Sequence, residues 1–195
     1  MDVILASNNS NKLREIKEKL NKYGMNVISQ KEAAYDIEVD ETGDTCEENA
    51  ILKAEAIYKL SKKQVIADDT GLEIDYLNGA PGVHSHRFAG PDATDEDRIK
   101  KVLTLLKDVP EQNRTARFRC TICYIDASGE KHIFNGVAEG KIGYEPRGNN
   151  GFGYDPIFIC EKNKTFAELT GEEKNKISHR GRAIEKFVEF LNQNQ

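Results

Sequence analysis

Three polar segments of the chain carry side chains that could do chemistry, and each is expected at the end of a helix or strand. The first is residues 7–12 (Ser-Asn-Asn-Ser-Asn-Lys), between an apolar strand at 3–6 and a helix start. Backbone N–H groups at a helix N-terminus and the helix dipole attract anions, and Lys12 adds a full positive charge. The segment therefore favours a phosphate site or, as the plain alternative, an Asn/Ser helix cap. It lacks the glycine spacing of a Walker A loop.

The second feature is acidic. Asp68-Asp69 follows a buried-looking strand at 65–67, and Asp40-Glu41 lies in a separate acidic loop, 36–44. Carboxylates on two loops can share one Mg²⁺, which prefers oxygen ligands and leaves positions for substrate phosphate. Such a metal would withdraw charge from a phosphoryl group, and a neighbouring carboxylate could accept the proton of the attacking water. For Asp68-Asp69 alone, the alternative is a solvated acidic turn before Gly71.

The third feature is residues 151–156 (Gly-Phe-Gly-Tyr-Asp-Pro). The glycines permit close approach of backbone, and Phe152 offers a flat face on which a base could stack. Asp155 could accept a hydrogen bond from a ring N–H. The alternative for this segment is a packed turn.

Further along the chain, Lys174 and residues 178–181 (Ser-His-Arg-Gly) add possible donors. His179 and Arg180 could donate to a keto oxygen. A donor-rich pocket would disfavour adenine, whose 6-amino group is itself a donor, because unpaired buried groups cost ~1–3 kcal/mol each. The alternative for this pair is a surface pair at a helix start.

Apolar spacing predicts the elements that must position these residues. Strands are expected near 3–6, 26–29, 65–67 and 72–75, and a hairpin near 116–125 and 131–139. Helices are expected from about 13 to Gly24, from Thr45 in a capping box with Glu48 to about Leu60, from Thr94 through Leu106, and from about Ser178 onward. Strands that alternate with helices and then form a long hairpin predict an α/β fold with a mixed sheet.

Composition narrows the function classes. The chain has 195 residues and a formal net charge of -5, which fits a single domain and argues against nucleic-acid binding. No signal peptide or membrane-spanning run is recognisable, so a cytoplasmic protein with reduced thiols is expected. Cys120 and Cys123 lie on a predicted strand, where positions three apart face opposite ways, so we reject them as a metal or redox pair.

Taken together, six segments in order resemble the inosine/xanthosine triphosphate pyrophosphatases, a family that acts on non-canonical purine nucleoside triphosphates. The segments, which cover almost the whole chain, are Leu5–Lys12, Glu41-Thr-Gly43 with Glu48-Asn-Ala50 and Lys53-Ala54, Ala67–Leu72, Gly79–Gly82, Gly151–Pro156 and Ser178–Gly181. The resemblance implies an elongated mixed-sheet α/β fold, a single domain over residues 1–195 with two lobes that flank a substrate cleft. It also implies a cytoplasmic homodimer and Mg²⁺-dependent cleavage of XTP, ITP and dITP to the monophosphate and pyrophosphate, clearing them from the nucleotide pool.

The same resemblance assigns roles to residues by position. Phosphate contacts are implied for Ser7, Asn8, Asn9, Ser10, Asn11 and Lys12, with Lys53 assisting. Nucleotide contacts are implied for Thr70, Phe152, Gly153, Tyr154, Asp155, Lys174, His179 and Arg180. Asp40 and Asp69 are implied as metal ligands, and Asp69 also as the proton acceptor. The family usually has Glu where this chain has Asp40, so Asp40 and Glu41 are both open as the ligand, and so are Asp68 and Asp69.

Rival functions are distinguishable. A pyrophosphatase for modified pyrimidines would not use His179 and Arg180 to read the base. A nucleotide-binding sensor without turnover would keep Lys12 and Phe152 but would need no carboxylate pair. A nucleic-acid-binding module conflicts with the acidic charge balance.

Overall fold

The computed structural model describes residues 2–161 and 163–194, which group into two compact units. The first unit comprises Met1–Asp69, Cys120–Gly136 and Arg180–Gln195. The second comprises Thr70–Arg119 and Val137–His179. Within the described part of the chain, no helix has the length and apolar character needed to cross a membrane.

The strands form a mixed sheet, as predicted. Their bounds are β1 Asp2–Leu5, β2 Asn26–Ser29, β3 Val65–Ile74, β4 Pro81–Gly82, β5 Thr115–Ile125, β6 Lys131–Ile142 and β7 Phe158–Ile159. Their order among the described residues is β2-β1-β3-β5-β6-β7, with β4 paired to β3. β1 runs parallel to β2 and β3, whereas β4 is antiparallel to β3 and β7 is antiparallel to β6.

Four of the five α-helices in the described residues were expected from apolar spacing and capping residues. The helices are α1 Ser10–Leu20, α2 Cys46–Ser61, α3 Asp95–Leu105, α4 Gly171–Ile177 and α5 His179–Gln193. The capping box of Thr45 and Glu48 is formed, and Thr94 makes a similar box at the start of α3. Helix α4 was not predicted because its seven residues include only one apolar side chain, Ile177, so no periodic stripe marks it.

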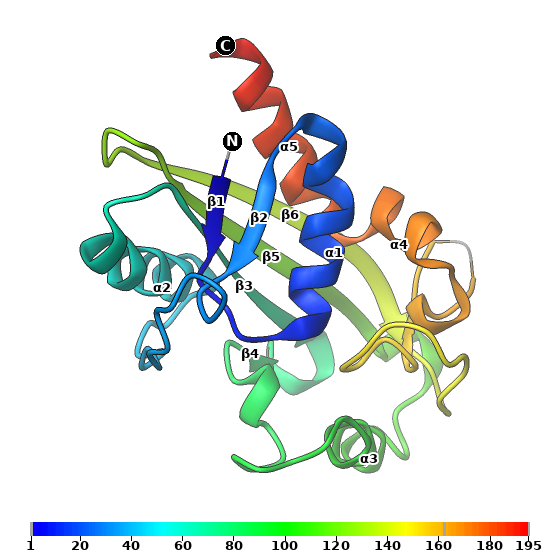
Figure 1. Cartoon of the computed structure of the whole chain (residues 1–195). Helices are drawn as coiled ribbons and strands as arrows, with labels where there is room; N and C mark the ends of the chain where they lie inside the picture. Colours follow the sequence, from blue (N-terminus) through cyan, green and yellow to red (C-terminus); the bar gives the residue numbers. More distant parts are fainter. Residues whose placement is uncertain (1, 162, 195) are drawn as a thin grey trace. The chain divides into compact units, whose positions relative to one another are not determined.

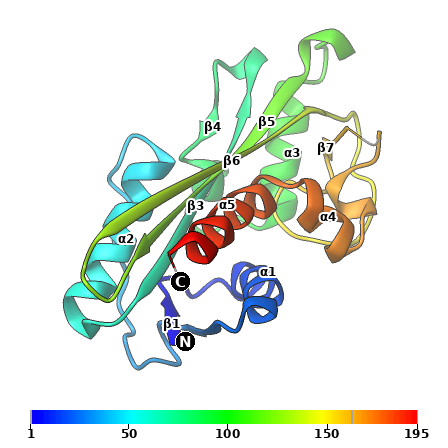
Figure 2. The ribbon, with the colours of Figure 1, turned by 90° about the horizontal axis from the view of Figure 1, so that it is seen from above.

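In the first unit, helices cover both faces of the sheet (Figures 1 and 2). Val3 and Leu5 pack with residues of α1 and α5, whereas Ile4 pairs with the alanines of α2 on the other face. Strand alternation therefore sorts the apolar side chains into two separate cores. Cys120 belongs to the α1/α5 core and Cys123 to the α2 core, so the sulfurs diverge as predicted.

In the second unit, α3 closes a core of its own. Ile99, Val102 and Leu106 are buried together with Phe118 and other aromatic residues of the unit. The apolar residues whose spacing predicted this helix are thus the ones that it buries in the core.

The strand β3 corrects one prediction. Asp68 and Asp69 were expected at a strand's end, before a turn at Gly71, but β3 runs without interruption from Val65 to Ile74. Both aspartates are buried mid-strand, with exposed fractions of 0% and 5%. The prediction that the strand ends at Asp68 was wrong because aspartate and glycine have low strand propensity, and here tertiary contacts override that propensity.

Candidate active site

Strand β3 sends its two aspartate side chains to opposite faces of the sheet. Successive residues of a strand alternate in direction, so Asp68 and Asp69 cannot face the same helix. Asp68 contacts Lys12 of α1, and Asp69 contacts Lys53 of α2. Asp68 and Asp69, both open as metal ligands, therefore belong to two separate groups of side chains, one on each face of the sheet.

On the α2 face, Lys53 joins two carboxylates. Its Nζ lies 2.8 Å from Oε1 of Glu41 and 3.0 Å from Oδ1 of Asp69. The other oxygen of Asp69, Oδ2, is buried, and the described residues offer it no N–H or O–H donor. We call Glu41, Lys53 and Asp69 the Asp69 group. Asp40, by contrast, is exposed, so of the two candidate acidic loop residues it is Glu41 that turns towards Asp69.

Burial and charge act in opposite directions on the residues beside Asp69. Burial alone would lower the pKa of Lys53, but Asp69, Asp68 and Glu41 outweigh it and raise that pKa. The ammonium group is therefore held charged. The Cys46 thiol, in the first turn of α2, has its pKa raised by burial and by the Asp69 carboxylate, so it stays a neutral thiol.

The loop that carries Glu41 is fastened to α2 by its own residues. The backbone N–H of Gly43 donates to Oδ1 of Asn49, at 2.8 Å, and Asn49 is fully buried. A Cβ atom on Gly43 would lie 2.6 Å from Cβ of Glu48, so only glycine allows this close approach. Asn49 was part of the motif but had no assigned role; it positions the Glu41 loop.

On the opposite face, Asp68 lies in a chain of buried charges. Lys12 Nζ is 3.3 Å from Oδ2 of Asp68, and Arg180 donates to the same oxygen from Nη2 at 3.0 Å and from Nε at 3.2 Å. Arg180 also pairs through Nη1 with Oε2 of Glu15, on α1. Burial alone would raise the pKa of Asp68, but Lys12, Arg180 and Lys53 hold it well below its usual range.

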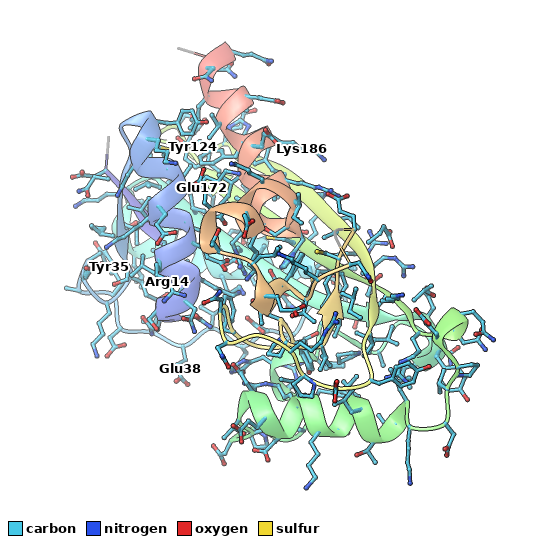
Figure 3. The ribbon with its side chains drawn as sticks, turned by 90° about the vertical axis from the view of Figure 1, so that its right-hand side faces the viewer. Arg14, Tyr35, Glu38, Tyr124, Glu172 and Lys186 are labelled. Carbon is cyan, nitrogen blue, oxygen red and sulfur yellow. The ribbon has the colours of Figure 1, made fainter. Side chains whose placement is uncertain are left out.

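The sequence pattern did not mark Glu15 as a candidate site residue. Glu15 is buried, whereas its neighbour Arg14, labelled in Figure 3, is exposed. A signal was available, because Glu15 follows Lys12 by three residues and so shares its helix face. A charged residue on the inward face of a helix needs a partner, and that partner, Arg180, is 165 positions away.

The segment from Ser7 to Lys12 mainly forms the N-terminal cap of α1. Asn9 is the N-cap of α1, and its Oδ1 accepts from the backbone N–H groups of Asn11 and Lys12. Ser7 Oγ accepts from the Asn9 N–H. The helix cap that was the alternative to a phosphate site is therefore formed, and the backbone N–H groups of Asn9, Asn11 and Lys12 already have acceptors. Asn8 and Ser10 are exposed, and the cation of the segment, Lys12, is directed at Asp68.

The second unit holds an aromatic group made of Phe152, Asp155 and Lys174. Oδ2 of Asp155 accepts from the Phe152 backbone N–H at 3.1 Å and from Nζ of Lys174 at 2.6 Å. That ammonium lies 4.9 Å from the centre of the Phe152 ring, a cation–π contact on one side of the ring. Phe152 is half-buried, whereas Asp155 and Lys174 are buried. The sequence predicted these three residues together, and the structure brings them together.

His179 and Arg180 are adjacent in sequence but have different surroundings. The His179 ring stacks on Phe118, with centroids 4.5 Å apart, and is buried. The Arg180 guanidinium, expected to read the base, is directed at Asp68 and Glu15 in the first unit, and its base-reading role stays a prediction. Thr70 follows Asp69 on β3 and is half-buried.

Fold and site together define a mixed α/β protein whose buried carboxylates are paired with lysine and arginine on both faces of one strand. Comparison with known proteins gives the family. The model of the Ham1 family matches residues 3–190, so the chain belongs to the Ham1 family. The resemblance drawn from the six motifs is thereby confirmed.

Relatives and solved structures agree over nearly the full length. The dITP/XTP pyrophosphatase of Bacillus subtilis (strain 168) is 50% identical over 191 residues, 97% of this chain and 96% of the relative. The dITP/XTP pyrophosphatase of Clostridium perfringens (strain 13 / Type A) is 50% identical over 195 residues, 96% of each chain. The structure of the Staphylococcus aureus Ham1 protein matches with a TM-score of 0.89 and 43% identity, over 100% of both chains.

Proposed function

We propose that this chain hydrolyses XTP, ITP and dITP to the nucleoside monophosphate and pyrophosphate, and so keeps these nucleotides out of DNA and RNA. Relatives that carry the name dITP/XTP pyrophosphatase support the reaction class. The structural observation that carries the proposal is the Asp69 group. It presents a buried carboxylate oxygen to which the described residues offer no N–H or O–H donor, beside a second carboxylate and a charged lysine.

We further propose Mg²⁺ as the cofactor of the Asp69 group. The residues fit this ion because Glu41 and Asp69 supply carboxylate oxygens, and Oδ2 of Asp69 is a buried acceptor with no N–H or O–H donor in the described part of the chain. Glu41 is the favoured second ligand because Asp40 is exposed. When bound, the metal would supply charge stabilisation for the phosphoryl group under attack.

In this proposal the chain's own side chains bind the triphosphate and move a proton. Lys12 and Lys53, which now pair with carboxylates, turn some of their N–H groups to the oxygens of the triphosphate, because the triphosphate carries more negative charge than a carboxylate. Asp69 accepts the proton of the attacking water, since a carboxylate within hydrogen-bond reach can act as a general base. Asp68 keeps the cations of the opposite face in place, because it pairs with both Lys12 and Arg180.

We propose that the purine ring is recognised by the aromatic group. The Phe152 ring is half-buried and in a cation–π contact with Lys174, and an aromatic ring of this kind can stack on a base. Asp155 accepts from a ring N–H, and the cationic Lys174 favours a keto oxygen over an amino group. A homodimer and a cytoplasmic location are further proposals, supported by the family resemblance.

A nucleotide panel with Mg²⁺ tests the reaction. ITP, XTP and dITP should be cleaved with direct release of pyrophosphate and far more efficiently than ATP. Asp69→Asn should lower kcat about 10²- to 10⁴-fold, the usual contribution of a general base, while ITP binding measured by calorimetry remains detectable. Asp44→Asn is the matched control, because Asp44 is an exposed aspartate at the end of the same acidic loop.

Each rival gives a different result in the same panel. Orthophosphate as the direct product would contradict the proposed release of pyrophosphate. Faster turnover of modified pyrimidine triphosphates would show that the enzyme prefers these bases and not 6-keto purines. Tight binding without turnover of any nucleotide would identify a sensor, and full activity of Asp69→Asn would remove Asp69 as the base.

A further inference from the structure

The backbone of residues 151–155 is held by hydrogen bonds within the segment, between Phe152 and Asp155, and by one from outside it. Gly151 and Gly153 have φ values of +74° and +61°, in the left-handed region that glycine enters freely. A Cβ on Gly151 would lie 2.0 Å from Oδ2 of Asp155, whereas a Cβ on Gly153 would have no described atom within 4 Å beyond its chain neighbours. Gly153 is therefore not confined by packing at its Cα, and its conformation needs another constraint.

That constraint comes from Asp95, in the first turn of α3. Oδ2 of Asp95 accepts from the backbone N–H of Gly153 at 2.7 Å, a short charge-assisted hydrogen bond. Its other oxygen, Oδ1, accepts from Nη2 of Arg98 at 2.6 Å. One carboxylate thus ties the glycine between Phe152 and Tyr154 to a helix.

Arg98 fixes the direction of the Asp95 carboxylate. The guanidinium is buried, and its Nη1 donates to the backbone oxygens of His86 at 2.6 Å and Ala93 at 2.9 Å. Arg98 therefore has little freedom to rotate away from Asp95. The next residue along the segment, Tyr154, is held separately, because its hydroxyl donates to the Ser85 carbonyl at 2.7 Å.

We propose that Asp95 is a positioning residue for base discrimination: by holding Gly153 it sets the direction of the Phe152 ring and of the Asp155 carboxylate. The inference rests on the proposed function, in which these two side chains recognise a 6-keto purine. Phe152 and Asp155 flank Gly153 and Tyr154 in sequence, so a backbone rotation at Gly153 would turn the ring away from the carboxylate. Asp95 itself touches the glycine backbone and acts only through it.

Three variants separate positioning from general destabilisation. Asp95→Ala removes the acceptor, Asp95→Asn keeps an oxygen that can accept from Gly153, and Glu96→Gln is the control. Glu96 is an exposed carboxylate in the same helical turn, so its neutralisation changes the charge at the helix N-terminus equally. The readouts are kcat and KM for ITP and ATP, the melting temperature, and hydrogen exchange of the Gly153 amide.

Asp95→Ala should lower the ITP to ATP ratio of kcat/KM about tenfold, mainly through a higher KM for ITP. The Gly153 amide should exchange faster in the same variant. Asp95→Asn should recover part of both losses, and Glu96→Gln should match the wild type in both.

Two results would overturn the inference. One is an unchanged ITP to ATP ratio in Asp95→Ala, whether or not the amide exchanges faster. The other is an equal change in Glu96→Gln, which would assign the effect to the helix charge. Failure of the proposed function looks different, because the wild type itself would then show no preference for ITP.

Discussion

Replacing Lys53 by methionine removes the positive charge between Glu41 and Asp69 while keeping the length of the side chain. The two carboxylate oxygens lie 2.8 and 3.0 Å from the same nitrogen, so they are at most about 5.8 Å apart. Two unit negative charges at that separation repel each other by about 3 kcal/mol at an effective dielectric constant of about 20. In the wild type, Lys53 compensates this repulsion, and removing one partner of a buried ion pair costs about 3–5 kcal/mol. We therefore expect Lys53→Met to lower the free energy of unfolding at pH 7 by about 3–5 kcal/mol, or the melting temperature by roughly 6–20 °C.

The destabilisation should depend on Mg²⁺. Mg²⁺ should restore the missing positive charge and raise the melting temperature of Lys53→Met more than that of the wild type. The assay is thermal unfolding at pH 7, with and without Mg²⁺.

Lys59→Met is the matched control for this series. Lys59 also lies on α2, but its side chain is 74% exposed and its contact with Glu55 is 4.0 Å long. A surface pair of this kind contributes little, so the control should stay within about 0.5 kcal/mol of the wild type. The reasoning is refuted if Lys53→Met is as stable as the control, or if it responds to Mg²⁺ no more than the control does.

Two further predictions concern the carboxylates. Glu41→Gln should raise the Mg²⁺ concentration needed for half-maximal activity about tenfold or more, whereas Asp40→Asn should leave it near the wild-type value; the reverse order in a metal titration would make Asp40 the ligand. The pKa of Asp68 is lower in the folded chain than in the unfolded chain, so its contribution to stability is present above pH ~4 and is lost as the pH falls further. The gap in unfolding free energy between wild type and Asp68→Asn should therefore narrow below pH ~4 in Mg²⁺-free buffer, and a gap that is constant from pH 7 to 3 would contradict the ion pairing.

Local sequence determined most of the elements and the order of the site segments. Periodic apolar residues located α1 and α3, and the Thr45 capping box marked the start of α2. Alternation along β5 was enough to place Cys120 and Cys123 in different cores. These features were accessible because each depends on residues a few positions apart.

Only the tertiary structure decided how the charges pair. Glu15, Asp68 and Arg180 are far apart in sequence, and nothing local to any of them identifies the others as partners. Likewise, β3 runs through Asp68 and Asp69 despite their low strand propensity, because its neighbours in the sheet and the cations on both faces offset that preference. Local spacing thus determines which way a side chain faces, but the group it faces is set by long-range packing, which is why the motifs could be found in the sequence and their contacts could not.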